Sequence, residues 1–410
     1  MHLAIDNTLA MFEQAKAQNI DNYIEGVHPV LSRPDTEYKG KVFKTAKILL
    51  QSVKPILDFH SSYLMGMPIS LTGDTEKMQM LNGVIKKGGY NKVNYDLVRS
   101  LYEFGNAYEY VFRDEKGVIK SHLIDAVDAY PIYEDGEYKA FIESWIDRQT
   151  QNTIEIIYYP DTVEKRVNGA LEGIYNNVTG LPIHYRLDRD DTGLFGVGLV
   201  SDLMPIMNEI EALLSKMSDT VSTLNMNPLG VAMGDRVDAQ IDREATGATL
   251  NIESGGDFKW ASASLDYNSI KLLLDELNNQ FYAVAQIPSA LFGNGNVANV
   301  SETSLQLLFN QADNLAKKTA LSVDEGLNKR WEYLSKLMGV DFTEVNVGFN
   351  YNRPVDNANT INNLKTLRDM GAISIESILR NSPYVNDVQK EMENLENEQK
   401  NKDMSKQDKA

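Results

Sequence analysis

The sequence predicts an α+β fold of several domains, in which helices and antiparallel strands occupy separate stretches. Residues 107–187 alternate apolar and polar side chains in short runs separated by Asp and Gly turns, a pattern typical of antiparallel strands. Residues 201–224 and 266–338 instead repeat apolar side chains at intervals of three and four, which is typical of helices. With 410 residues, 42% of them hydrophobic, the chain can bury two or three cores.

The first hundred residues are expected to form three helices. Residues 1–25 predict an amphipathic helix, and its apolar face is assigned to Leu3, Leu9, Phe12 and Ala15. A second helix is predicted from Lys44 to Tyr63 and is ended by Gly66, before a strand led by Pro68. A third helix is predicted from about Asn94 to Gly105.

Strands follow the third helix. Ala107–Arg113 and Val118–Lys120 flank the turn Asp114–Gly117, which is the spacing of a hairpin. Further strands rich in Tyr, Ile and Val are predicted at Ala129–Tyr133, Lys139–Asp147, Thr153–Tyr159, Val163–Val167 and Pro182–Leu187. Their order along the chain predicts an antiparallel meander.

Two helices then enclose a small β-rich insert. The first helix, Ser201–Leu224, ends at Asn227-Pro228, and the second, Asp266–Ile287, ends at Pro288. Three short strands are predicted between them, at Leu229–Met233, Thr249–Ile252 and Phe258–Ala261.

A loop of glycine and asparagine leads from this second helix into a much longer one. Such residues tolerate positive φ and carry little bulk, so the loop can project as a tight finger. Its residues are Gly293, Asn294, Gly295, Asn296, Val297, Ala298 and Asn299. The glycine spacing also fits a dinucleotide fingerprint, but that motif must follow a strand, so we expect no nucleotide and no other cofactor here.

The longest predicted helix restarts at Asn299, which with Glu302 has the spacing of a capping box, and runs to Met338 without a proline, roughly 40 residues and about 60 Å. It carries five acidic and five basic side chains, a balance that permits contact between neighbouring copies. Lys317 and Lys318 are its candidates for contact with DNA or with another subunit. A strand is predicted at Val345–Tyr351, followed by helices from Asp356 and a frayed or disordered tail after about Glu398.

Composition excludes several classes of protein. A net charge of −18 disfavours a generic basic nucleic-acid binder, so any DNA contact is expected to be loose. The chain has no cysteine, which excludes disulfides and thiolate catalysis. It shows no signal peptide and no run of 18 apolar residues, so we expect a soluble protein that does not enter a membrane.

No catalytic motif is evident, and the five histidines are scattered. Carboxylates do gather at Asp188, Asp190 and Asp191, just before a glycine-rich turn. Oxygen ligands of this kind can hold Ca²⁺ or Mg²⁺, which leaves a metal-dependent enzyme as one alternative. A solvated acidic loop explains the same residues more simply.

Several short stretches carry a family resemblance through their order and spacing. They are Tyr63–Ile69 (Tyr-Leu-x-Gly-x-Pro), Tyr102–Glu109 (containing Gly-x-Ala-Tyr-Glu), Gly180–Ile183, Leu203–Ile206, Ile287-Pro288 and Ser301–Ser304. In this order they resemble the portal proteins of tailed double-stranded-DNA bacteriophages, in particular the siphovirus type. The resemblance covers nearly the whole chain.

The resemblance implies a homo-oligomeric ring, usually of twelve subunits, at one capsid vertex of the virion. The implied parts are a wing (1–200), a first stem helix (201–228), a clip (229–265), a second stem helix (266–288), a tunnel loop (289–300), a long wing helix with a returning strand (301–356), and a helical crown with its tail (357–410). Gly293–Asn299 would face the channel.

The implied function is passage of double-stranded DNA, not catalysis. The implied partners are DNA bound without sequence specificity, the terminase large subunit, head-to-tail adaptors, and the major capsid and scaffolding proteins, met during assembly in the host cytoplasm. A non-portal adaptor or scaffold protein of a capsid remains a second alternative, and it predicts particles without a central channel.

Overall fold

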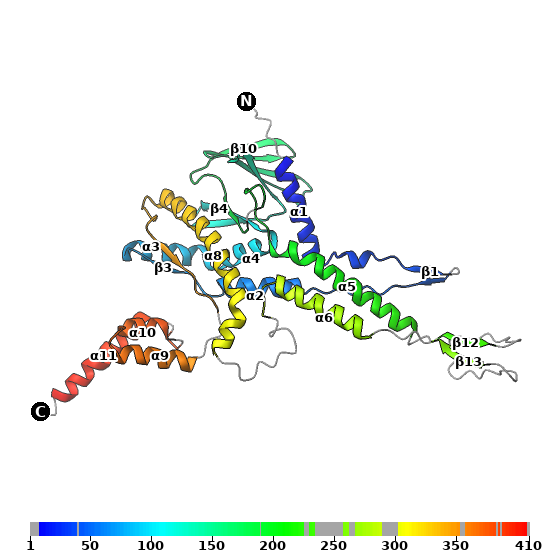
Figure 1. Ribbon diagram of the computed structural model, residues 1–410. Coiled ribbons are helices and arrows are strands. Elements are labelled where there is room, and N and C mark those ends of the chain that lie inside the picture. Colours follow the sequence, from blue (N-terminus) through cyan, green and yellow to red (C-terminus); the bar gives the residue numbers. More distant parts are fainter. Residues whose placement is uncertain are drawn as a thin grey trace. The chain divides into compact units, whose positions relative to one another are not determined.

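The computed structural model describes residues 8–38, 41–188, 190–224, 229–233, 257–261, 267–288, 302–352, 357–382, 384–385 and 388–407 (Figure 1). By its contacts the chain divides into two compact units. The first comprises Met1–Asn296 and Phe309–Asn352, and the second comprises Val297–Leu308 and Arg353–Ala410. The predicted α+β class is confirmed, because helices and antiparallel strands occupy separate stretches.

The first unit contains most of the helices. They are α1 (Thr8–Ile24), a 3-10 turn η1 (Pro29–Ser32), α2 (Val53–Met65), α3 (Thr75–Gly88), α4 (Tyr90–Phe104), α5 (Leu199–Leu224), α6 (Tyr267–Val284) and, from Phe309 onward, α8 (Glu302–Met338). Local chemistry sets several ends. The Asp74 carboxylate accepts the N–H groups of Glu76 and Lys77 at 3.1 Å and starts α3, and Gly89, at a φ of 70°, ends it.

Two antiparallel sheets form the β part of this unit. A five-stranded sheet has the order β10-β9-β8-β7-β6, and a three-stranded sheet has the order β11-β4-β5. The strands are β4 (Asn106–Arg113), β5 (Ile119–Ile124), β6 (Ala129–Glu134), β7 (Glu137–Ile146), β8 (Thr153–Tyr158), β9 (Thr162–Val167), β10 (Ala170–Asn176) and β11 (Ile183–Arg186). The predicted meander is therefore confirmed for β6–β9, and β10 adds a fifth strand to it.

Three strand pairs stand apart from these sheets. They are β1 (Thr36–Tyr38) with β2 (Lys41–Phe43), β3 (Ser70–Thr72) with β14 (Asn346–Gly348), and β12 (Leu229–Met233) with β13 (Asp257–Ala261). The pair β3–β14 confirms the predicted strand after Pro68 and the returning strand. The pair β12–β13 confirms two of the three strands predicted in the insert; the third, Thr249–Ile252, lies outside the described residues.

The long helix α8 approaches the three-stranded sheet very closely. A Cβ placed on Gly326 would lie 2.0 Å from Cε1 of Tyr185 in β11, so only glycine fits this turn of the helix. Leu327, Trp331 and Leu334 continue the same buried face. The predicted apolar periodicity of α8 therefore marks its packing against the sheet.

A buried ion pair joins α8 to this sheet. Arg330 is 1% exposed, and its Nε and Nη2 donate to Oε2 of Glu109 in β4 at 3.0 and 2.8 Å. The Tyr185 hydroxyl donates to the same oxygen at 2.5 Å, and Arg330 Nη1 donates to Oδ1 of Asn94 in α4 at 2.7 Å. The guanidinium also lies over the ring of Tyr90, 5.1 Å from its centroid. One arginine thus connects two helices and two strands.

The second unit is helical. It contains α9 (Asn357–Asp369), α10 (Ile375–Asn381) and α11 (Val388–Gln407). The Ser374 hydroxyl accepts the N–H of Ser377 at 3.1 Å and caps α10, and Gly371 follows α9 at a φ of 71°. Among the described side chains of these three helices, none is buried. These helices therefore lack a core of their own in the described residues.

Three sequence predictions are wrong. Helix α1 buries Ala10, Ala17, Ile20 and Tyr23, whereas Leu9 and Phe12 of the predicted face are 38% and 60% exposed, because small residues allow α1 to lie flat on β6. The second helix begins at Val53, not Lys44, because side chains of α5 bind the backbone of residues 46–50. The tail is helical to Gln407, beyond Glu398, since Glu, Lys and Gln are strong helix formers without apolar periodicity.

Three elements were not predicted. Helix α3 has only one buried side chain, Leu81, and so gives little apolar periodicity. Strand β10 is exposed along most of its length, although the turn Asn168-Gly169 before it, with both φ angles positive, is a strong hairpin signal. The hairpin β1–β2 has strands of three residues each, too short for a pattern.

The buried ion pair gives a stability prediction. Replacing Glu109→Ala or Arg330→Ala leaves one charge buried without its partner, so each variant should lose about 3–5 kcal/mol of unfolding free energy. The double variant should lose clearly less than the sum of the two single losses, because it leaves neither charge unpaired. Chemical denaturation of the four proteins measures this coupling. Additive losses would show that the pair does not couple α8 to the sheet.

Candidate functional site

Helices α5 and α6 form an antiparallel pair on either side of the insert, and α6 returns alongside α5 (Figure 1). The first half of α5 is packed, with Leu203, Met207 and Ile210 buried. Apolar side chains are exposed farther along the pair, where Val221 of α5 is 41% exposed and Leu272 of α6 is 72% exposed. The pair thus leaves apolar surface in solvent at its end nearer the insert.

A segment from the N-terminal part of the chain, residues 28–50, lies on α5; we call it the arm. Three backbone N–H groups of the arm donate to three side chains of α5. The bonds are Leu50 N–H to Glu211 Oε1 at 2.7 Å, Ile48 N–H to Ser215 Oγ at 2.9 Å, and Ala46 N–H to Asp219 Oδ1 at 2.6 Å. Alternate residues of the arm therefore bond to every fourth residue of the helix, as an extended chain on one helical face permits.

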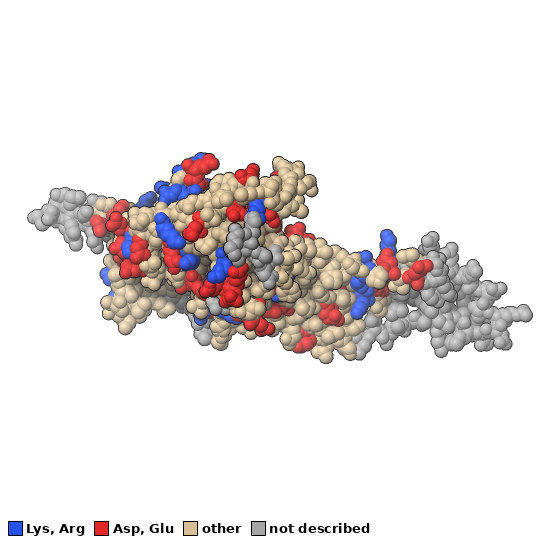
Figure 2. Space-filling view, turned by 90° about the horizontal axis from the view of Figure 1, so that it is seen from above, with Lys and Arg blue, Asp and Glu red and all other residues tan. Residues whose placement is uncertain are grey.

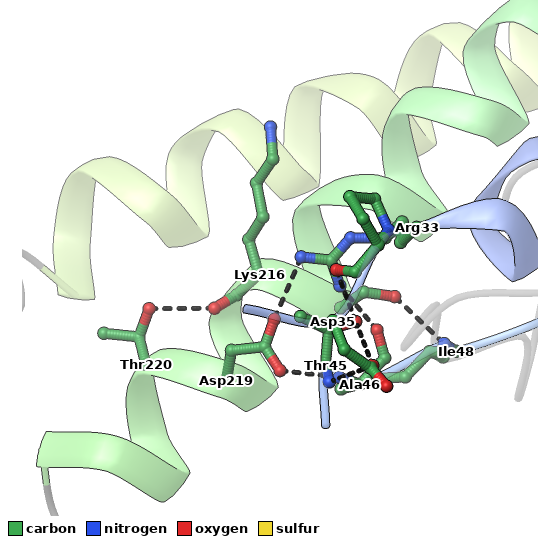
Figure 3. A network of polar contacts seen from close by, with 10 residues as sticks. Arg33, Asp35, Thr45, Ala46, Ile48, Lys216, Asp219 and Thr220 are labelled. Atoms are coloured by element: carbon green, nitrogen blue, oxygen red, sulfur yellow. Dashed lines mark hydrogen bonds and ion pairs between the residues drawn. The ribbon is translucent and has the colours of Figure 1, made fainter. Parts of the chain in front are cut away.

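Arg33 adds a second contact at Asp219, the acceptor nearest the C-terminal end of α5 (Figure 3). Its Nη2 donates to Oδ2 of Asp219 at 2.9 Å, and its Nη1 donates to the carbonyl of Ala46. Asp219 therefore holds both the strand-like part of the arm and the turn before it. Next to it, the Asp35 carboxylate accepts the N–H of Thr45 at 3.0 Å and closes the base of the β1–β2 hairpin.

His28 fixes the inner end of the arm. Its Nδ1 lies 2.9 Å from both carboxylate oxygens of Glu211, and its Nε2 lies 2.9 Å from the carbonyl of Tyr23. Both ring nitrogens therefore face oxygen atoms that can accept a hydrogen bond. His28 and Glu211 are 3% and 0% exposed, and the imidazole stacks on the Tyr23 ring at 3.7 Å. This buried pair joins α1, the arm and α5.

Helix α2 holds the chain on both sides of the predicted finger loop. Burial lowers the pKa of His60 to about 4, so its ring is neutral and Nε2–H donates to the carbonyl of Ala285, one residue past α6, at 2.7 Å. On the other side, Tyr63 stacks on Phe309 of α8, with centroids 6.0 Å apart, and its hydroxyl donates to Asp313. One helix therefore anchors the segments that precede and follow residues 289–301.

Of the residues predicted to face the channel or DNA, only Lys317 and Lys318 lie among the described residues. Gly293–Asn299 lie outside the described residues. Lys317 and Lys318 are both exposed, and Lys318 pairs with Asp188 of the same chain.

The acidic cluster has structural partners. Asp188 pairs with Lys318, and Asp190 accepts the Thr192 hydroxyl at 2.6 Å and the N–H of Phe195 at 3.4 Å. These hydrogen bonds lower the pKa of Asp190 although its partial burial opposes them. Asp191 is exposed. In the part of the chain that the structure describes, no group of three or more His, Asp or Glu side chains could hold a metal ion.

Comparison with known proteins assigns the chain to a family. The model of the phage portal proteins described as SPP1 Gp6-like matches residues 13–404. The chain belongs to this portal family. A comparison with curated proteins gives no match.

Solved structures share the fold of this portal protein. A chain from the neck of an empty GTA particle, computed with C6 symmetry, covers 78% of this chain and 86% of its own length, at 13% identity and a TM-score of 0.53. Chains from the neck of the native GTA particle, computed with C12 symmetry, and from the native gene transfer agent virion each match at 12% identity, with TM-scores of 0.51 and 0.50. Both cover 79% of this chain and 87% of their own.

The structure shows what the family-like stretches do in this portal protein. Glu109, at the end of Tyr102–Glu109, is the partner of Arg330. In the same stretch a Cβ on Gly105, at a φ of 81°, would lie 2.5 Å from the backbone of Gly196 and Val197. Ile287 and Pro288, next to Ala285, are buried.

Among the described helices, none is long and apolar enough to cross a lipid bilayer.

The arm was missed at the sequence level, although a signal for it exists. Glu211, Ser215 and Asp219 form a polar stripe along an otherwise apolar part of α5. A stripe of acceptors at intervals of four residues implies donors that must come from elsewhere, since the helix has satisfied its own backbone. The sequence does not say which segment supplies them.

The arm contact leads to a prediction about local stability. Asp219→Ala removes the acceptor of Ala46 N–H and of Arg33, so amide exchange in residues 44–48 should accelerate on the order of tenfold, a loss of about 1–2 kcal/mol. Thr220→Ala is the matched control, because its hydroxyl bonds only to the carbonyl of Lys216 in the same helix. Hydrogen exchange with mass spectrometry measures both. Equal protection in the two variants would exclude the arm contact in solution.

Proposed function

We propose that this portal protein forms a homo-oligomeric ring, usually of twelve subunits, at one vertex of a phage capsid, and that double-stranded DNA passes through the ring. The terminase drives DNA inward during packaging, and the same channel serves ejection. Family membership over residues 13–404 carries this proposal. The similar chains come from the neck and the virion of GTA particles, computed with C6 and C12 symmetry for the necks, and this origin supports the ring and the virion location.

The parts of the chain take the following roles in this proposal. Residues 1–200 with 301–356 form the wing, helices 201–228 and 266–288 form the stem, and 229–265 form the clip. Residues 289–300 form the tunnel loop, and residues 357–410 form the crown and its tail. The α5–α6 pair supports the stem assignment, because neighbouring subunits in a ring would cover its exposed Val221 and Leu272.

Charge supports a conduit for DNA. In the view of Figure 2, basic and acidic side chains are interspersed and do not form a continuous basic face. A continuous basic lining would bind the phosphate backbone through counterion release and would hold DNA in place. Neutral amides, such as those of Asn294 and Asn296 in the proposed loop, can instead form weak hydrogen bonds to phosphates without reading sequence.

The proposed partners follow from passage through a vertex. They are DNA without sequence specificity, the terminase large subunit and later head-to-tail adaptors at the clip, and the major capsid and scaffolding proteins around the wing. Assembly takes place in the host cytoplasm. In this scheme the terminase hydrolyses ATP, so the portal protein itself performs no chemistry and needs no cofactor.

Electron microscopy of the purified protein tests this function. We expect class averages of rings with rotational symmetry and a central hole wide enough for a duplex, about 20 Å. Compact monomers or dimers at all protein and salt concentrations would contradict the ring. Closed particles without a hole would instead support an adaptor or scaffold protein.

The tunnel loop leads to a second prediction. Replacing residues 293–299 by a rigid segment containing proline should leave ring assembly intact and reduce the yield of packaged DNA at least tenfold. The reason is that a rigid loop cannot adjust to a moving duplex. A loop of equal length made of glycine and serine is the control. Normal packaging with the proline segment would exclude a role for loop mobility.

A further inference from the structure

The β1–β2 hairpin, in the middle of the arm, extends along α5 toward the C-terminal end of that helix. Ala46 is bonded to Asp219, and α5 ends five residues later at Leu224, about 7.5 Å along the helix. Phe43 precedes Ala46 by three residues, about 10 Å in an extended chain. The β1–β2 hairpin therefore reaches the level at which α5 ends.

This hairpin has no partner strand among the described residues, where β1 and β2 form a two-stranded sheet alone. Val42 is 65% exposed, and Lys44 and Lys47 are exposed. A two-stranded hairpin alone is marginally stable in water. Its persistence next to α5 is easier to explain if a further surface covers it.

The hairpin is basic in an acidic chain. Residues 36–47 contain four lysines and one glutamate, a net charge of +3, whereas the whole chain carries −18. Such a segment fits a surface that combines apolar and acidic groups.

Helix α6 presents such a surface. Leu272 is 72% exposed and Leu273 is 48% exposed, and the next turn carries the exposed carboxylates of Asp275 and Glu276. The surface lies in the first half of α6, which runs beside the second half of α5, where the arm is bonded (Figure 1). The hairpin and this surface therefore lie at the same level of the helix pair.

Within one chain the two surfaces are separated by α5. In the view of Figure 1, α5 lies between the β1–β2 hairpin and α6. Each copy thus presents a basic hairpin on one side of α5 and an acidic, apolar helix on the other. Repeating such a unit around an axis brings the arm of one copy toward α6 of the next, which is a heterologous contact that closes into a ring.

We infer that the β1–β2 hairpin of one subunit docks on the Leu272–Glu276 surface of α6 in the neighbouring subunit. Val42 packs against the two leucines, and Lys44 and Lys47 pair with Asp275 and Glu276. This inference rests on the proposed ring and names a contact within it. The hydrogen bonds between α5 and the arm lie within one subunit. They then serve the contact between subunits, because they hold the hairpin in position for the next copy.

Cysteine crosslinking tests the contact directly, since the natural chain contains no cysteine. Two proteins are made, one carrying Val42→Cys and one carrying Leu272→Cys, and they are mixed before assembly and oxidised. We expect a disulfide-linked dimer that contains one chain of each kind, seen on a non-reducing gel and by mass spectrometry. A single chain carrying both substitutions should give a ladder of linked oligomers.

The matched control for Leu272→Cys is Asn279→Cys, which is also exposed on α6. It lies seven residues farther along the helix, about 10.5 Å away, beyond the reach of a disulfide from Val42. We expect at least tenfold less linked dimer with this control. Equal yields at the two positions would show random collision and would overturn the inference.

Charge reversal gives an independent test. Lys44→Glu with Lys47→Glu should raise the protein concentration needed for half-maximal ring formation on the order of tenfold. Adding Asp275→Lys and Glu276→Lys to the same chain should restore assembly. If the reversed arm leaves assembly unchanged and instead weakens binding of a random DNA duplex, the arm is a DNA contact and the inference is wrong.

The outcomes separate this contact from the proposed function. Closed rings without a disulfide between positions 42 and 272 would overturn the docked hairpin and leave the portal ring standing. A disulfide formed only within one chain would also overturn it. Linked chains that never close into rings would support the contact and contradict the ring.

Discussion

The buried pair of Arg330 and Glu109 is the interaction on which the first unit depends. The other contacts of α8 with the three-stranded sheet are apolar packing, which fixes distance but not register, and more exposed polar contacts such as Arg186 with Glu325 at 3.7 Å. The guanidinium demands acceptors in fixed directions and finds them on β4 and α4. Tyr185 donates to the same carboxylate, and its ring lies so close to α8 that only glycine fits at position 326. The turn of α8 that contains Gly326 and Arg330 therefore fixes the register of this helix against the sheet.

This register connects the core to the candidate site. Phe309 and Asp313 belong to the same helix as Arg330, and they contact α2 through Tyr63. Helix α2 in turn holds Ala285 through His60. A shift of α8 along its axis would thus reach the chain on both sides of residues 289–301. Sheet, long helix and loop anchors form one connected set of contacts.

The sequence predicted the features that depend on long periodic patterns. Helices α5, α6 and α8 and the meander β6–β9 were expected at nearly their observed bounds, because each repeats its pattern over several turns or strands. Residues 44–52 were predicted as helix from local preference, but the acceptors of α5 take their N–H groups, and tertiary contact overrides propensity. The face of α1 was wrong because Ala10 and Ala17, not the larger Leu9 and Phe12, allow close packing.

The arm and α5 differ in their rise per residue, and this difference limits how far one can follow the other. Four residues of a helix rise about 6 Å, whereas two residues of a strand rise about 6.7 Å, so each successive bond starts about 0.7 Å farther out of step. Hydrogen bonds tolerate only a few tenths of an ångström beyond their usual range, and side-chain rotation can absorb the difference over about three steps. An extended chain can therefore follow one face of a helix for only a few such bonds. In this chain three bonds, of 2.6 to 2.9 Å, lie between the hairpin and α2.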